Sequence, residues 1–195
     1  MAFRDDTVVI QCEKSRYRST FFSFGLHRIA QMPSNPCKLA TGSIPHRLGP
    51  GDPALRDVLD LIRRGFAGMD GRIDPPSSMN RLTVADLSAP THEVWAIGMP
   101  PRACVVLTPR SDTLYLGKLA VADHARGHGL ARVLVEHAIE RASALGLPSV
   151  TLQVRVELIE NHATFARLGF AEVARTAHPG YDRPTSVTFR RAVFP

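Results

Sequence analysis

A strand, a glycine-bearing loop and a long helix follow one another without interruption in the middle of this chain. Residues 113–121 form an apolar run that is short enough for one buried strand. From Leu130 onward, apolar residues recur every three or four positions, which predicts a helix that Gly146 caps and Pro148 prevents from continuing. The connecting loop, residues 123–131, carries glycines and basic side chains directly into the helix start. The rest of the chain must fold around this unit.

This loop has the properties of an anion-binding site. The start of a helix leaves backbone N–H groups without partners and carries the positive end of the helix dipole, and phosphate oxygens satisfy both. A Cβ at Gly127 or Gly129 would hold the backbone away from a diphosphate and disfavour positive φ. The alternative is that both glycines are ordinary turn residues. Two known phosphate loops are excluded, because Arg132 stands where a dinucleotide fingerprint needs glycine and no Gly-Lys-Ser/Thr sequence is present.

Arg126, Gly129 and Ala131 match the Arg/Gln-x-x-Gly-x-Gly/Ala motif of the GCN5-related N-acetyltransferases (GNAT). The chain resembles this family from residues 119–121, which are similar to the end of its strand 4, through the whole following helix. The resemblance implies an α/β (α+β) acyltransferase fold, with a mixed, mostly antiparallel twisted sheet that is splayed between strands 4 and 5 and has helices on both faces. It also implies acetyl-coenzyme A as cofactor. Contacts to it are expected from Leu119, Ala120, Val121, Arg126, Gly127, His128, Gly129, Leu130 and Ala131.

Length and composition are those of one soluble domain. The chain has 195 residues, of which 44% are hydrophobic and 22% charged, and no apolar run reaches the ~20 residues that cross a bilayer. Cys12, Cys37 and Cys104 are odd in number and widely spaced, so we expect neither a disulfide framework nor a metal site, and a reducing, cytoplasmic setting. The net charge is +6, but the arginines are scattered without interleaved aromatic residues, so nucleic acid is not an expected partner.

The first part of the chain differs from the rest. Residues 21–26 are apolar but too short and broken for a signal peptide, and residues 32–36 are turn-rich. Residues 1–43 are therefore expected to be a disordered extension, or to reflect a start assigned too early, with Met32 as the true beginning. Residues 44–195 are expected to form the N-acetyltransferase domain.

Further elements are predicted on both sides of the central unit. A helix is expected to open at Pro53, and a second, short one lies in the region where the family covers its acceptor. Apolar residues alternate with polar ones in residues 150–156, which predicts a half-buried strand. The other predicted strands cover residues 93–97, 103–108, 171–177 and 185–193, and a helix covers residues 160–168.

The second motif of the family is only partly present. Gly169-Phe170 matches, but Phe165 occupies the slot of the family's tyrosine, whose hydroxyl is its usual acid for the departing thiolate. Leu158 occupies the usual asparagine slot, and Asn161 lies one turn later. Asn161 and Phe165 share one helical face, which we expect to lie along the pantetheine arm. The alternatives are that Asn161 caps the helix and that Phe165 is core.

Acetyl transfer needs a deprotonated amine, stabilisation of negative charge on oxygen, and a thiolate that can leave. The resemblance assigns the second task to a backbone N–H near Leu119. The family's base slots hold Gly117 and Tyr115, and Tyr115 is a weak base that could bind acceptor or relay a proton. His162 and Tyr181 are the candidates for protonating the thiolate. The remaining candidates are His92, Glu93, Glu157, Glu160 and His178.

The expected reaction is direct transfer of acetyl from acetyl-coenzyme A to a primary amine of a small molecule or peptide. Cys104 could act as a nucleophile, but a cysteine in an apolar strand is usually core. The acceptor stays open among amino acids, polyamines, antibiotics and protein N-termini, and a homodimer is one possible assembly. The alternative function is a non-catalytic acyl-coenzyme A binding or sensing module, because Phe165 lacks a hydroxyl.

Overall fold

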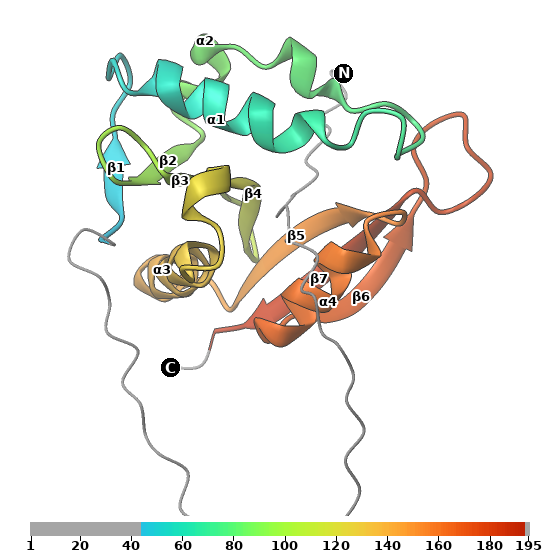
Figure 1. Cartoon of the computed structure of the whole chain (residues 1–195). Coiled ribbons are helices and arrows are strands. Elements are labelled where there is room, and N and C mark those ends of the chain that lie inside the picture. Colours follow the sequence, from blue (N-terminus) through green and yellow to red (C-terminus); the bar gives the residue numbers. More distant parts are fainter. Residues whose placement is uncertain (1–43, 194–195) are drawn as a thin grey trace, which may run out of the picture.

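A seven-stranded sheet forms the centre of the computed structural model, which describes residues 44–193 (Figure 1). The strand order is β1-β2-β3-β4-β5-β7-β6, and every neighbouring pair is antiparallel except β4 and β5, which are parallel. The strands are β1 (His46–Leu48), β2 (Glu93–Ile97), β3 (Ala103–Pro109), β4 (Leu114–Val121), β5 (Ser149–Arg155), β6 (Ala171–Thr176) and β7 (Ser186–Ala192). The predicted mixed, mostly antiparallel sheet is confirmed.

Helices cover both faces of this sheet. The elements are α1 (Leu55–Ala67), α2 (Val84–Leu87), α3 (Leu130–Ala144) and α4 (Ile159–Arg167), with 3-10 turns η1 (Ser78–Arg81) and η2 (Asp123–Ala125). Helices α1 and α3 pack on β3 and β4 from opposite sides (Figure 1). The first helix begins at Leu55 rather than Pro53, because the backbone before it forms tighter i→i+3 turns, with the Leu55 N–H donating to the Asp52 carbonyl at 3.0 Å. Among residues 44–193, no helix is both long and apolar enough to span a membrane.

Strands β4 and β5 separate soon after they begin. They pair only at Leu114 with Val150 and at Tyr115 with Thr151, and then diverge (Figure 1). The other edge of β5 pairs with β7 along its whole length, from Ser149 to Arg155. The predicted splay is therefore confirmed, and it leaves the facing edges of both strands without a strand neighbour beyond their first residues.

Strand β5 is buried on both faces, so the prediction of a half-buried strand was wrong. Thr151 is 5% exposed and Arg155 is fully buried. The polar side chains are tolerated because they have partners: the Thr113 hydroxyl donates to Thr151 Oγ1 at 3.2 Å, and Arg155 donates to the Pro75 carbonyl at 2.6 Å. The alternating sequence pattern shows which side chains of this strand are polar. It cannot show that hydrogen bonds to distant residues allow those side chains to be buried.

A β-bulge interrupts β4 just before its end. Cys104 pairs with Ala120 whereas Val106 pairs with Gly117, so Lys118 and Leu119 together face one residue of β3. Lys118 has φ of 48°, a left-handed conformation that costs a non-glycine residue about 1–3 kcal/mol. A bulge bends its strand and leaves the extra residue outside the hydrogen-bond ladder. The sequence did not predict this feature.

An ion pair fastens α3 to the edge of the sheet. The Arg141 guanidinium donates to both carboxylate oxygens of Glu93, with a shortest distance of 2.6 Å, and the Trp95 indole donates to the same carboxylate at 3.1 Å. The hydrogen bonds from Arg141 hold the pKa of Glu93 below its ordinary value. Glu93 thus holds α3 on the sheet, and its carboxylate is fully occupied by Arg141 and Trp95.

Replacing Arg141 by methionine leaves the buried Glu93 carboxylate without its cation, and we expect the free energy of unfolding to fall by about 2 kcal/mol at neutral pH. A carboxyl whose pKa is lowered by folding stabilises the fold above the pKa of the unfolded chain and loses that contribution as pH falls through the folded value. The cost should therefore shrink on acidification. Urea unfolding of the parent, Arg141→Met, Glu93→Gln and the double variant measures this coupling, and additive costs at neutral pH would contradict it.

Candidate functional site

The loop from β4 to α3 presents backbone N–H groups at the start of a long helix. Gly127 and Gly129 both have φ of 76°, and Gly129 is the N-cap of α3 without a side-chain cap. The first hydrogen bond of this helix runs from the Val133 N–H to the Gly129 carbonyl at 3.1 Å, so the N–H groups of residues 129–132 have no partner within the helix. The predicted geometry of an anion cradle is present.

Space is available on the side from which a ligand would approach the cradle. A Cβ added at Gly127 or at Gly129 would meet no atom within 4 Å. A side chain there would not collide with the protein, but it would occupy the space in front of the N–H groups and strain a backbone with positive φ. Both glycines therefore fit a backbone that must be approached closely by a ligand.

The side chains of the cradle are held in place from within the loop. Arg126 forms an ion pair with Asp123, and the His128 ring contacts the Arg126 carbonyl through Nδ1 at 2.8 Å. Leu130 is buried and anchors the first turn of α3, while Ala131 beside it is partly buried. The motif residues thus shape the loop and leave backbone amides as the groups that meet a ligand.

The edge of β4 continues the cradle into the splay. Leu119 and Ala120 are buried and Val121 is partly buried. Leu119 belongs to the bulge, which frees backbone from the ladder with β3. A freed backbone N–H at this place can donate to an oxygen on which negative charge develops, as the expectation for Leu119 requires.

Asn161 on α4 carries a buried amide that has no partner. The side chain is 1% exposed, and neither Oδ1 nor Nδ2 forms a hydrogen bond among the described residues. Asn161 does not cap the helix, since Leu158 is the N-cap. An unsatisfied buried polar group costs about 1–3 kcal/mol, so a ligand with amide groups would relieve a substantial penalty here. This side chain fits the pantetheine arm of coenzyme A, which carries two amides.

Phe165 lies one turn further along the same face and is completely buried. Its ring packs edge-on against Phe170, with centroids 5.8 Å apart, and lies 6.4 Å from the ring of Phe189. These contacts are those of a core residue. Its expected contact with the cofactor stays a prediction.

The three candidates for proton transfer are all engaged with neighbours. His162 Nε2 lies 2.9 Å from the Arg155 carbonyl, so this nitrogen carries the proton and Nδ1 is the acceptor in the neutral ring. The Tyr181 hydroxyl donates to Asp74 at 2.6 Å, and this hydrogen bond raises the pKa of Tyr181. Tyr115 is 3% exposed, with the Arg110 guanidinium 3.9 Å above its ring.

Charged residues tie together the loop after α1, the end of β5 and the β6–β7 hairpin. The Asp74 carboxylate pairs with Arg183 at 2.7 Å, and its backbone N–H donates to Glu157 at 3.2 Å. Arg155 contacts His178 Nε2 at 3.2 Å, in addition to its bond with the Pro75 carbonyl. The structure therefore brings several sequence candidates to one end of the sheet, and adds Asp74 and Arg155, which sequence reasoning missed.

Other candidates lie elsewhere. His92 contacts the Thr108 hydroxyl at 3.0 Å, and Glu93 is held by Arg141, so both serve the opposite half of the sheet. Burial raises the pKa of the Cys104 thiol to about 12, which makes it unreactive as a nucleophile. Within the described part of the chain, no group of three or more side chains is arranged to hold a metal ion.

Comparisons with known proteins agree with this geometry. The family model "Acetyltransferase (GNAT) family" matches residues 76–170. No curated protein sequence matches. Among solved structures, aminoglycoside 6'-acetyltransferase type Ii superposes with a TM-score of 0.61 at 19% identity, over 78% of this chain and 98% of that one. These values establish a shared fold.

Two further structures give the same result. The ribosomal-protein-S18-alanine N-acetyltransferase from Escherichia coli has a TM-score of 0.57 at 20% identity, over 77% of this chain and 93% of that one. A Bacillus subtilis acetyltransferase in complex with CoA has a TM-score of 0.56 at 16% identity, over 77% and 98%. The family match spans both splayed strands and the cradle between them, and this part of the chain therefore forms a GNAT-type N-acetyltransferase domain.

Proposed function

We propose that this protein transfers an acetyl group directly from acetyl-coenzyme A to a primary amine of a small molecule or peptide, through a domain formed by residues 44–195. The observation that carries the proposal is the combination of two unsatisfied features. Unpartnered N–H groups in the glycine cradle match a diphosphate, and the buried amide of Asn161 matches the pantetheine amides. The inertness of Cys104 supports a direct route without an acyl-enzyme.

Different residues of the chain are proposed to bind the cofactor and to orient its thioester. Residues 126–131 hold the diphosphate through backbone N–H groups, and residues 119–121 line the splay with strand backbone. The thioester of the cofactor supplies the acetyl group. The bulge at Leu119 offers a backbone N–H to the carbonyl oxygen, a contribution worth roughly 10²–10³ in rate for a comparable donor.

Proton transfer is assigned to the end of the sheet where the hairpin and the loop after α1 meet. The Tyr181 hydroxyl is protonated at neutral pH, as an ordinary tyrosine is, and its hydrogen bond to Asp74, which raises its pKa, orients it. His162 can accept at Nδ1 the proton that the attacking amine loses and then pass it to the departing thiolate, while its Nε2 stays bonded to the Arg155 carbonyl. Both are proposed to serve the departing thiolate, since Phe165 offers no hydroxyl.

The second candidate function is a non-catalytic acyl-coenzyme A sensor, which the core position of Phe165 favours. A thiol-release assay over a panel of amines separates the two functions. We expect release of coenzyme A that depends on the amine, with a kcat in Tyr181→Phe or His162→Gln that is about 10²-fold lower at saturating cofactor. Tight binding of acetyl-coenzyme A without release for any amine would favour the sensor, and unchanged kcat values would remove both residues.

A glutamate at Gly129 should abolish binding of coenzyme A, because it fills the cradle and brings negative charge to the phosphates. Gly146 is a matched control: it has φ of 68°, also meets open space, and lies at the opposite end of the same helix. We expect Gly129→Glu to weaken binding at least about 100-fold in calorimetry, while Gly146→Glu loses similar stability but binds normally. Equal affinities in the two folded variants would refute the proposed cradle.

Replacing Asn161 by leucine should change stability and affinity in opposite directions. The substitution removes two unsatisfied buried groups, so the free energy of unfolding should rise by about 1 kcal/mol without ligand. The affinity for coenzyme A should fall about tenfold, because the ligand loses its partner. Thermal unfolding with and without coenzyme A measures both, and a variant that is less stable and binds equally well would assign Asn161 to the fold alone.

A further inference from the structure

A fully buried arginine, Arg155, ends β5, where the loop after α1 and the β6–β7 hairpin lie side by side (Figure 1). Its guanidinium donates to the Pro75 carbonyl at 2.6 Å and to His178 Nε2 at 3.2 Å, and its Nε lies 3.9 Å from the Glu157 carboxylate. A guanidinium is costly to remove from water unless polar contacts compensate for the lost hydration. The compensating contacts come from the loop and from the hairpin, so Arg155 links these two segments from inside the fold.

The hydrogen bonds of His178 continue this link into the hairpin. Because a guanidinium can only donate, His178 Nε2 accepts and Nδ1 carries the proton of the ring. Nδ1 then donates to the Thr185 hydroxyl, which also accepts the His178 backbone N–H at 2.9 Å. The His178 carbonyl accepts the Tyr181 N–H at 3.0 Å. Arg155 is thus connected, through one imidazole, to the turn that carries Tyr181.

The contact with Pro75 fixes the loop beside the same turn. The preceding residue is Asp74, whose carboxylate accepts the Tyr181 hydroxyl at 2.6 Å and pairs with Arg183 at 2.7 Å. The side chains of Asp74 and Arg183 are 56% and 51% exposed, and exposed ion pairs contribute little because water screens them. These contacts orient the Tyr181 hydroxyl, whereas the buried hydrogen bonds of Arg155 hold the loop against the hairpin.

We propose that Arg155 is a positioning residue, which sets the loop and the hairpin at the distance at which Asp74 orients the Tyr181 hydroxyl for proton transfer. This inference rests on the proposed function, in which Tyr181 serves the departing thiolate. It adds a residue that acts through its two neighbours. A displacement of a reacting group by about 1 Å can lower a rate about 10²-fold, so such alignment bears directly on turnover.

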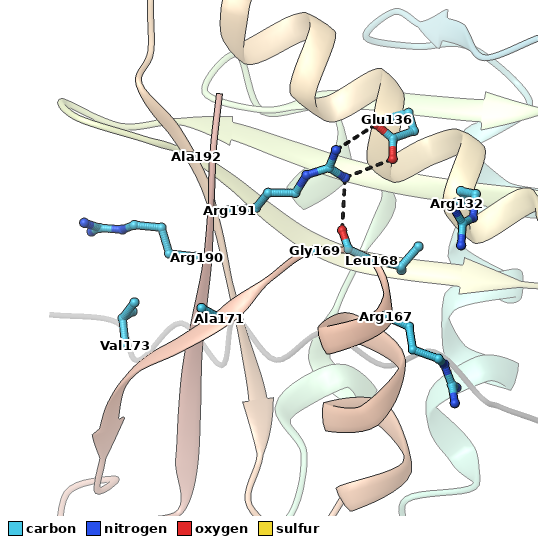
Figure 2. Close-up of a pocket in the computed structure, with 10 residues that line it drawn as sticks. All are labelled: Arg132, Glu136, Arg167, Leu168, Gly169, Ala171, Val173, Arg190, Arg191 and Ala192. Atoms are coloured by element: carbon cyan, nitrogen blue, oxygen red, sulfur yellow. Dashed lines mark hydrogen bonds and ion pairs between the residues drawn. The ribbon is translucent and has the colours of Figure 1, made fainter. Parts of the chain in front are cut away.

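A second arginine of the same pair of strands provides the matched control. Arg191 lies on β7 beside the first residues of β5, whereas Arg155 ends β5. Its guanidinium donates to both oxygens of Glu136, at 2.9 and 3.1 Å, and to the Leu168 carbonyl at 3.0 Å, so it joins α3 to the end of α4 (Figure 2). Arg191 therefore links two elements through a carbonyl, as Arg155 does, at the opposite end of the strand pair from the hairpin.

Ionisation of Tyr181 tests the positioning, because the sign of the change separates it from a simple charge effect. The hydrogen bond to Asp74 raises the pKa of Tyr181, and the positive charge of Arg155 lowers it. Arg155→Met should raise this pKa if charge alone is lost, and should lower it toward the ordinary value of ~10 if Asp74 releases the hydroxyl. We expect it to fall. The measurement is tyrosinate absorbance against pH, taken as the difference between each protein and its Tyr181→Phe counterpart.

Two further variants complete the titration. His178→Leu cuts the link from the hairpin side while keeping the charge of Arg155, and it should also lower the pKa of Tyr181. Arg191→Met should leave this pKa unchanged. A folded Arg155→Met protein in which the pKa of Tyr181 rises or stays the same overturns the proposal. If that variant does not fold, an unchanged pKa in His178→Leu overturns it instead.

Turnover separates failure of this inference from failure of the proposed function. With saturating acetyl-coenzyme A and the fastest amine of the panel, Arg155→Met should lower kcat about tenfold in the parent and less than about twofold in the Tyr181→Phe background. Arg191→Met should keep the kcat of the parent. If Tyr181→Phe leaves kcat unchanged, the assigned proton transfer fails and the inference falls with it. If Tyr181→Phe lowers kcat and the two effects multiply, Arg155 supports the fold alone and the proposed function stands.

Discussion

The separation of β4 from β5 is the constraint on which the site depends. Two parallel strands that pair for only two residues leave backbone groups on both facing edges, and buried backbone groups need partners. The chain keeps the strands apart from both sides. β5 pairs fully with β7, and β4 contains a bulge at Lys118 that bends it against β3. The unfilled edges, the cradle at the end of β4 and the orphaned amide of Asn161 thus form one arrangement, which matches the long, amide-bearing ligand of the proposed function.

How much the sequence could predict depends on how local each feature is. Arg126, Gly129 and Ala131 located the cradle because positive φ and a helix start are determined within a few residues. The left-handed Lys118 was not predictable, since a bulge arises from the register of β4 against β3 and has no composition of its own. Such strain is tolerated only where the surroundings impose it, which is typical of functional backbone.

Arg155 shows the same limit for side chains. The alternating pattern assigned it to a polar face, whereas the structure buries it completely against the Pro75 carbonyl, 80 residues earlier in the chain. Asp74 was missed for the same reason, because its partners Tyr181 and Arg183 are more than 100 residues away. Arg155 ends β5 and Asp74 lies in the loop after α1, and each meets its partners only in the folded protein. The acceptor end of the site therefore could not be predicted from the sequence, whereas the fold could.

The two ends of the site also differ in what their contacts can contribute to the reaction. Contacts to the diphosphate and to the nucleotide are the same before and during acyl transfer, so they provide affinity and orientation but cannot by themselves lower the barrier. Groups that meet developing charge can do so, and in the proposed function they are the N–H of the β4 bulge, Tyr181 with its partner Asp74, and His162. Since Phe165 has no hydroxyl and is fixed in the core, the proposed function assigns proton transfer to His162 on the same helix and to Tyr181 in the hairpin. Under that proposal the ion pair between Asp74 and Arg183 bears on chemistry as well as on structure, because it holds the hairpin that carries Tyr181.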